Sequence, residues 1–295
     1  MALNSMEENK LDAVPFRSVL APEMYAERNA HTCDLSLDLF QVYKMAFRTP
    51  SDESQQFLDI GCGPGDFMRN WILPSCEPCK RIVAVDSSIS MIEYAKKNYA
   101  HEKILYEHLD IDNDVSAFSK KHGAFQRVYS FKTLHWSRDL HRCLGNIAQL
   151  LSRGGECLLY FHARSFLFES FKELSHLEPW TKYADVLLRA VPKSHNIVNR
   201  RSLQDYLYSA LSSAGLVPYT AEVLVSQQCV QSKNPGTDGL YQIGNPLFSL
   251  LDDEERPAFV DALSRHLNEW HDLYCRSGGQ NVFSAFLVHA VKPEE

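Results

Sequence analysis

Short apolar runs alternate with amphipathic stretches along the first half of the chain. Runs rich in β-forming residues occupy five segments, 56–60, 81–86, 104–109, 127–131 and 156–162. Between them, apolar residues recur at helical spacing in segments 91–99 and 140–151, and Gly154 and Gly155 are expected to stop the second helix. This order predicts right-handed βαβ crossovers and a mostly parallel sheet covered by helices on both faces.

The second half of the chain has a different pattern. Residues 165–200 are aromatic and helical in spacing, with Pro179 and Pro192 interrupting them, which predicts an inserted cap. The spacing over 203–214 predicts an amphipathic helix closed by Gly215. A strand at 216–230, a helix at 252–276 and a strand at 281–291 follow, and the two strands should finish the sheet as an antiparallel edge pair.

These patterns predict an α/β fold, a Rossmann-like doubly wound and mostly parallel sheet of seven strands with a helical cap insertion. We expect four segments along the 295 residues. They are an N-terminal helical segment covering the site at 1–50, a Rossmann-like ligand-binding core at 51–163, a helical substrate cap at 164–200, and a segment at 201–295 that completes the sheet and adds the C-terminal helix.

Composition and charge narrow the class of protein. Hydrophobic residues make up 45% and charged residues 23% of the chain, as expected of a folded globular protein. The net charge of −7 disfavours a nucleic acid partner, because such partners need a positive field. No long apolar run or signal-like N-terminus is present, so we expect a cytoplasmic protein without a membrane partner. The lone CxxC of Cys76 and Cys79 lacks a second ligand pair, and no metal is expected.

The most informative segment is FLDIGCGPGD at 57–66, an apolar strand that enters a glycine-dense turn before a helix. Glycines allow a sharp turn and a close approach by a ligand, and the helix N-terminus that follows favours a negative group. Asp66 stands where a dinucleotide-binding fingerprint has its third glycine, which disfavours NAD. Asp86 ends the next strand, where a carboxylate can accept hydrogen bonds from ribose hydroxyls. A nucleoside that carries a carboxylate fits this pattern.

In these residues the sequence resembles the class I S-adenosylmethionine-dependent methyltransferases, through FLDIGCGPG, through VAVD ending at Asp86, and through Asp110-Ile111 after the third strand. The resemblance covers roughly residues 55–160. It implies that Asp59 and the glycines line the methionine part of the cofactor, that Asp86 holds the ribose, and that Met91 packs on the adenine. The product is then S-adenosyl-L-homocysteine. The full expected cofactor set is Tyr25, Asp59, Gly61, Cys62, Gly63, Gly65, Asp86, Ser87, Met91, Asp110, Ile111, Ser130 and Phe131.

Candidate acceptor-binding residues follow the fourth and fifth strands. His135 and Trp136 come just after the fourth strand, and His162 ends the fifth, where strand ends border the ligand crevice of a doubly wound sheet. An indole donates one hydrogen bond and offers an apolar wall, which suits a hydrophobic acid. A carboxylate acceptor is already deprotonated at neutral pH, so it needs donors and alignment and no general base. Tyr25 is expected to cover the cofactor from the N-terminal helix.

Segment 128–136, the glycine loop and residues 24–29 together resemble the arthropod juvenile hormone acid O-methyltransferases. That family methylates carboxyl groups of farnesoic-type acids, with a Trp that Trp136 matches and a Gln on the N-terminal helix. The position of the Gln is Thr32 in this chain, a departure that leaves the acid open between a farnesoic type and an aromatic one such as benzoic or salicylic acid. Thr32 could equally be a helix N-cap. The expected partner is therefore a small-molecule carboxylic acid.

Two other functions stay open at this point. A small-molecule N-methyltransferase would need a base or an amine-binding NPPY-type segment, and no such segment occurs. A non-catalytic scaffold would keep the fold and the cofactor without turnover. The aromatic cap residues are expected to form core more than a pocket wall, and His135 and Trp136 could merely pack beneath the cap. Those cap residues are Phe166, Phe168, Phe171, Trp180 and Tyr183.

Overall fold

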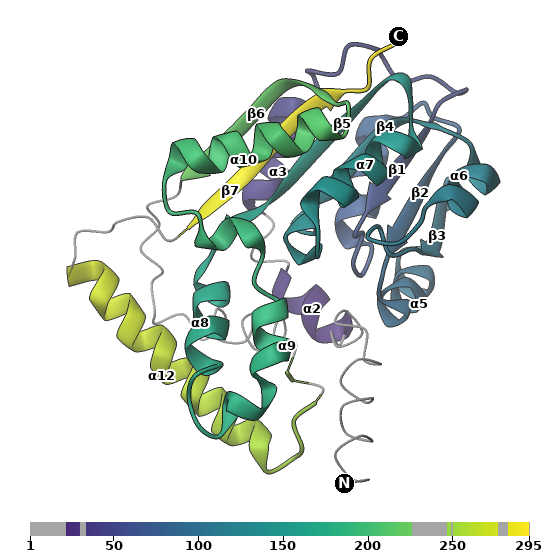
Figure 1. Cartoon of the computed structure of the whole chain (residues 1–295). Helices are drawn as coiled ribbons and strands as arrows, with labels where there is room; N and C mark the ends of the chain where they lie inside the picture. Colours follow the sequence, from purple (N-terminus) through teal and green to yellow (C-terminus); the bar gives the residue numbers. More distant parts are fainter. Residues whose placement is uncertain (1–21, 30–33, 226–246, 249, 277–282, 295) are drawn as a thin grey trace, which may run out of the picture.

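The computed structural model describes residues 22–29, 34–225, 247–248, 250–276 and 283–294. Within them, seven strands form one sheet in the order β3-β2-β1-β4-β5-β7-β6. The first five strands pair in parallel, and β7 runs antiparallel to both of its neighbours, which confirms the mostly parallel sheet (Figure 1). The strands are β1 Gln56–Ile60, β2 Arg81–Asp86, β3 Ile104–His108, β4 Phe125–Phe131, β5 Leu151–Arg164, β6 Val217–Val225 and β7 Ser284–Val291.

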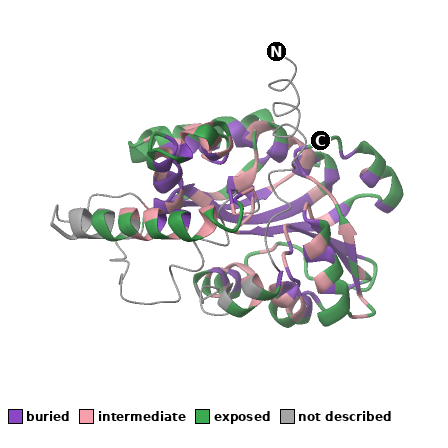
Figure 2. Ribbon diagram, turned by 90° about the horizontal axis from the view of Figure 1, so that it is seen from below, coloured by how far each residue is buried: buried purple, intermediate pink, exposed green. Residues whose placement is uncertain are grey.

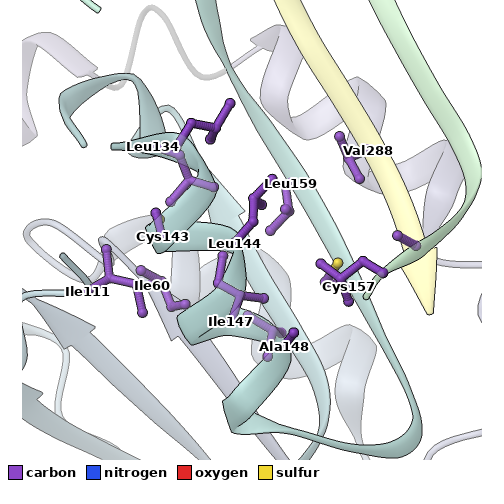
Figure 3. Close-up of a cluster of buried hydrophobic side chains, with 14 of the residues drawn as sticks. Ile60, Ile111, Leu134, Cys143, Leu144, Ile147, Ala148, Cys157, Leu159 and Val288 are labelled. Carbon is purple, nitrogen blue, oxygen red and sulfur yellow. The ribbon is translucent and has the colours of Figure 1, made fainter. Parts of the chain in front are cut away.

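Helices cover both faces of this sheet (Figure 2). On one face, α6 (Ser116–His122), α7 (Leu140–Leu150) and α10 (Arg200–Ser213) bury their apolar sides against the strands. Figure 3 shows Leu144 and Ile147 of α7 among the strand side chains of this core. On the other face lie α3 (Asp34–Tyr43), η1 (Met68–Ile72), α4 (Leu73–Cys76) and α5 (Ile89–Asn98). Helices on both faces confirm the doubly wound arrangement, and they bury both faces of central strands such as β1.

Side-chain caps determine where three of these helices begin. The side chain of Ser88 accepts a hydrogen bond from a first-turn amide of α5, and those of Asp139 and Asn199 do the same for α7 and α10. Each cap satisfies amides that have no partner inside the helix. The cap at Ser88 matters most for the site, because Ser88 lies only two residues beyond the end of β2.

The predicted cap insertion is present between β5 and α10. It consists of α8 (Phe166–Leu174), η3 (Trp180–Tyr183), α9 (Ala184–Arg189) and η4 (Lys193–Asn196). It packs with α12 (Glu255–Arg276) around a separate apolar cluster, in which the rings of Trp180 and Phe259 lie 5.1 Å apart. Phe168 and Phe171 are fully buried in that cluster, so they form core as expected.

The prediction that Gly154 and Gly155 stop the helix over 140–151 is wrong. The helix α7 ends at Leu150, and both glycines lie inside β5. They are held there because Gly154 donates a backbone hydrogen bond of 2.9 Å to Lys292, and Lys292 donates one of 2.9 Å to Gly155. Pairing with the last strand therefore overrides the helix-stopping tendency of glycine.

Other boundaries differ by a few residues. The strand β4 begins earlier than the predicted segment 127–131, β3 ends one residue earlier than 104–109, and α12 begins at Glu255 instead of 252. Residues 226–230 of the predicted strand 216–230 and residues 281–282 of the predicted strand 281–291 lie outside the described residues.

Candidate functional site

The glycine turn after β1 is held by the end of β2. The amides of Gly61 and Cys62 donate to the carbonyl oxygen of Val85 at 2.7 and 3.0 Å. The φ angles of Gly61, Gly63 and Gly65 are 76°, 54° and 92°, a region that side chains disfavour. The sharp reversal predicted from the sequence is thus a structural requirement of these three positions.

Two of the three glycines are also required by close packing. A Cβ atom on Gly61 would lie 2.1 Å from the side chain of Thr133, and one on Gly65 would lie 2.9 Å from the Cβ of Ala95. A Cβ on Gly63 would meet only the ring of Tyr25, at 3.7 Å. Gly63 therefore faces the space beneath Tyr25, where a ligand can approach the main chain.

The carboxylate of Asp86 connects this turn to α5. Its Oδ2 accepts a hydrogen bond of 3.0 Å from the amide of Gly63, and its Oδ1 accepts one of 2.8 Å from the amide of Ser88. A carboxylate offers about four lone-pair directions, so Asp86 keeps capacity to accept from ligand hydroxyls. This is the chemistry expected at the end of β2.

Tyr25, Asp59, Cys62, Asp66 and Phe131 line one crevice together with Gly61 and Gly63. Burial, and secondarily the charge of Asp86, raise the pKa of Asp59 to about 8. Burial also raises the pKa of Asp66. Buried carboxylates of this kind are stabilised in the charged form by a nearby cation, such as a ligand ammonium group.

The remaining expected cofactor residues differ in exposure. Ser130 is fully buried and donates a 2.8 Å hydrogen bond to the carbonyl of Ile60, while Met91 and Ile111 are also buried. Asp110 lies two residues beyond β3, and its carboxylate is 3.7 Å from the guanidinium of Arg138. Ser87, at the neighbouring end of β2, contacts the ring of His108 through its carbonyl at 3.1 Å. These residues stay predicted cofactor ligands.

The predicted acceptor residues form one aromatic cluster. The rings of His135 and His162 stack at 4.8 Å and 17°, and Trp136 lies 4.9 Å from His135. Phe168 of the cap contacts both His135 and Trp136, at 5.8 and 5.9 Å. Burial, and secondarily the charge of Lys132, lower the pKa of His162 to about 4. The structure therefore brings these three residues together under the cap. Thr32 lies outside the described residues.

Sequence reasoning missed Lys132 and Thr133, two residues between the strand β4 and the aromatic cluster that adjoin the glycine turn. Thr133 donates from Oγ1 to the carbonyls of Gly61 and Phe131, at 3.2 and 3.1 Å, and so connects the end of β4 to the glycine turn. Lys132 lines the crevice with a φ of 53°. Their place directly after a parallel strand was the available signal, because ligands bind at such ends.

Within the described part of the chain, no cluster of three or more metal-ligating side chains is found. Cys76 and Cys79 are free and buried thiols there. None of the described helices combines the length and the apolar character needed to cross a bilayer. The cytoplasmic location and the absence of a nucleic acid partner stay predictions.

Comparison with known proteins identifies the kind of domain that carries this crevice. Residues 57–155 match a family model described as a methyltransferase domain. The chain is 33% identical over 139 residues to juvenile hormone acid O-methyltransferase of Bombyx mori, covering 47% of this chain and 49% of that protein. It is 30% identical over 195 residues to the enzyme of the same name from Drosophila melanogaster, covering 65% of this chain and 63% of that protein.

These alignments thus span about half to two thirds of the length of the two relatives. Among solved structures, the YcgJ protein from Bacillus subtilis superposes with a TM-score of 0.51 and 16% identity, covering 88% of this chain and 99% of that one. This similarity supports the fold alone.

Alanine substitutions in the glycine turn should separate close packing from backbone strain. Gly61→Ala is expected to lower the free energy of unfolding by more than about 2 kcal/mol, because it combines a positive φ with the contact to Thr133. Gly63→Ala should cost about 1 kcal/mol, from the φ angle alone. Gly145→Ala in α7, where nothing lies within 4 Å, should stabilise by about 0.5–1 kcal/mol. Urea unfolding measures all three, and equal effects at Gly61 and Gly145 would contradict the packing argument.

Proposed function

Because the chain carries a methyltransferase domain of the class I S-adenosylmethionine-dependent type and resembles the juvenile hormone acid O-methyltransferases, we propose that it methylates the carboxylate of a small apolar acid. The acid is of the farnesoic type or aromatic, such as benzoic or salicylic acid. The observation that carries the proposal is the cluster of His135, Trp136 and His162 against Phe168 of the cap. Two members of this cluster follow closely after Phe131 and Lys132, which line the glycine crevice.

The residues of the crevice fit this cofactor. The backbone at Gly63 is open to a ligand, and buried Asp59 favours a positively charged group such as the ammonium of the methionine part. Asp86 and Asp110, at neighbouring strand ends, would hold the ribose and the adenine edge. Bound there, S-adenosylmethionine supplies a methyl group on a sulfonium, which an acceptor oxygen displaces directly.

The acceptor cluster favours an acceptor that is already deprotonated. A general base works best when its pKa lies near the operating pH, and the pKa of His162 is lowered to about 4. His162 is therefore a poor base for an amine or a phenol at neutral pH. A carboxylate avoids this requirement and needs only alignment, hydrogen-bond donors such as the Trp136 indole, and exclusion of water by the cap.

The test is product analysis by mass spectrometry with isotopically labelled cofactor. The panel contains farnesoic, juvenile hormone, fatty and aromatic acids together with matched amines and phenols. Labelled methyl esters support the proposal. Labelled amines would favour an N-methyltransferase, and tight cofactor binding without any product would favour a non-catalytic scaffold.

Cofactor binding should depend on pH through Asp59. Its pKa of about 8 means that the carboxyl is protonated near pH 6, and pairing with a ligand ammonium requires the charged form. Affinity should therefore rise between about pH 5.5 and about pH 7.5, by up to about tenfold per pH unit, and binding should release protons. Calorimetry in two buffers of different ionisation enthalpy measures both effects. An unchanged pH dependence in Asp59→Asn would remove Asp59 from this role.

Substitutions at Asp86 and Trp136 should affect different constants. Asp86→Ala removes the acceptor of the Gly63 and Ser88 amides and of the proposed ribose contacts, so cofactor affinity should fall by about 10- to 100-fold. Trp136→Ala should mainly raise the KM for the acid, because it removes an indole donor and an apolar wall. Each variant serves as the control for the other. Unchanged acid kinetics in Trp136→Ala would defeat the acceptor-site assignment.

A further inference from the structure

Lys132 adopts a conformation that lysine disfavours. It is the one non-glycine residue in the described part of the chain with a positive φ, at 53°. Its amide donates a 2.6 Å hydrogen bond to the carbonyl of Tyr160, and the next residue, Thr133, bonds to the carbonyls of Gly61 and Phe131. Such strain persists only where the surrounding structure enforces it, and it gathers at ligand sites.

The strained residue occupies the junction between the two parts of the proposed site. It lines the crevice together with Asp59, Gly63 and Asp66, and it follows the strand that leads to His135 and Trp136. Its positive charge opposes the burial that raises the pKa of Asp66, and it adds to the burial that lowers the pKa of His162. Lys132 thus lines the crevice and acts electrostatically on a residue of the acceptor cluster.

The charges around the crevice make this position important for an anionic acceptor. The crevice wall carries two acids, the buried Asp59 and the half-buried Asp66. Lys132 is the cation among the described residues that line it. A carboxylate that enters a partly dehydrated site is unfavourable unless a positive group pairs with it. An ammonium on a flexible stem provides three donors for one carboxylate oxygen.

We propose that Lys132 is a specificity-determining residue that binds the carboxylate of the acceptor acid and selects acids over uncharged acceptors of the same shape. The proposal rests on the proposed function and assigns the recognition of the acid group to one side chain.

The experiment compares Lys132→Met, Lys132→Arg and Lys120→Met with the wild type, using farnesoic and benzoic acids. Lys120 is exposed on α6 and provides a control that loses the same charge. The KM for the acid should rise about 10- to 100-fold in Lys132→Met, as expected for loss of a hydrogen bond to a charged group. Lys132→Arg should recover most of this loss, and Lys120→Met should behave as wild type.

Binding measurements exclude the other roles of this lysine. In the presence of S-adenosyl-L-homocysteine, Lys132→Met should bind the acid more weakly and the methyl ester of the same acid as tightly as the wild type does. The affinity for S-adenosyl-L-homocysteine should change much less than the affinity for the acid, although Lys132 lines the same crevice. A parallel loss of the affinity for S-adenosyl-L-homocysteine would overturn the proposal, because Lys132 would then hold the cofactor carboxylate. An unchanged KM would also overturn it.

Failure of the proposed function gives a different result. If the wild type forms no methyl ester from any acid of the panel, the carboxyl methyltransferase proposal fails and this inference fails with it. If the wild type forms esters and Lys132→Met forms them with the same KM, the inference alone is wrong. A further variant, Lys132→Gly, separates folding from acid binding. Its melting temperature should stay at or above the wild-type value, because glycine relieves the strain of the positive φ. Its binding of the acid should be lost.

Discussion

The site depends on the bonds by which the end of β2 holds the turn after β1. The carbonyl oxygen of Val85 accepts hydrogen bonds from two backbone amides of that turn. The carboxylate of Asp86 accepts one from a third amide, that of Gly63, and one from the amide of Ser88, just before α5. A buried turn with three positive φ angles would otherwise leave amides without partners, which is costly. Because these bonds pull the turn tight, Gly61 comes close enough for Thr133 to reach its carbonyl. The end of β4 and the aromatic residues after it are thereby placed relative to the crevice.

The cap has its own apolar core with α12, and Figure 1 shows α8 and α9 beside that helix. Trp136, which follows β4, packs against this core. In the proposed reaction, an aromatic wall shared by the cap and the sheet would keep water away from the acceptor without contributing a charged group. The site then has two parts. The rings around His135 form the apolar part, and the acids of the crevice form the polar part.

Much of this architecture could be predicted from the sequence. The apolar runs located β1 and β2 to the residue, because a strand that is buried on both faces carries a continuous apolar signal. The strand β5 was predicted too short, since its first residues include Gly154, with a φ of 69°, and Gly155. Both are held by backbone hydrogen bonds to Lys292, just beyond β7. The grouping of His135, Trp136 and His162 followed from the rule that parallel strand ends share one edge. The same rule places Lys132 and Thr133 at that edge, but the hydrogen bond from Thr133 to a turn some seventy residues earlier could not be predicted from the sequence pattern.

The position of β7 between β5 and β6 determines the order in which the sheet can form during synthesis. The strand β7 pairs with β5 on one side and β6 on the other, although both precede it in the chain, β5 by more than a hundred residues. In a nascent chain that ends at β6, the strand β5 has an open edge and β6 has no partner strand. Such edges are prone to pair with other chains. The strands β1 to β5 can pair with one another earlier, but β6 joins the sheet only once β7 has been synthesised.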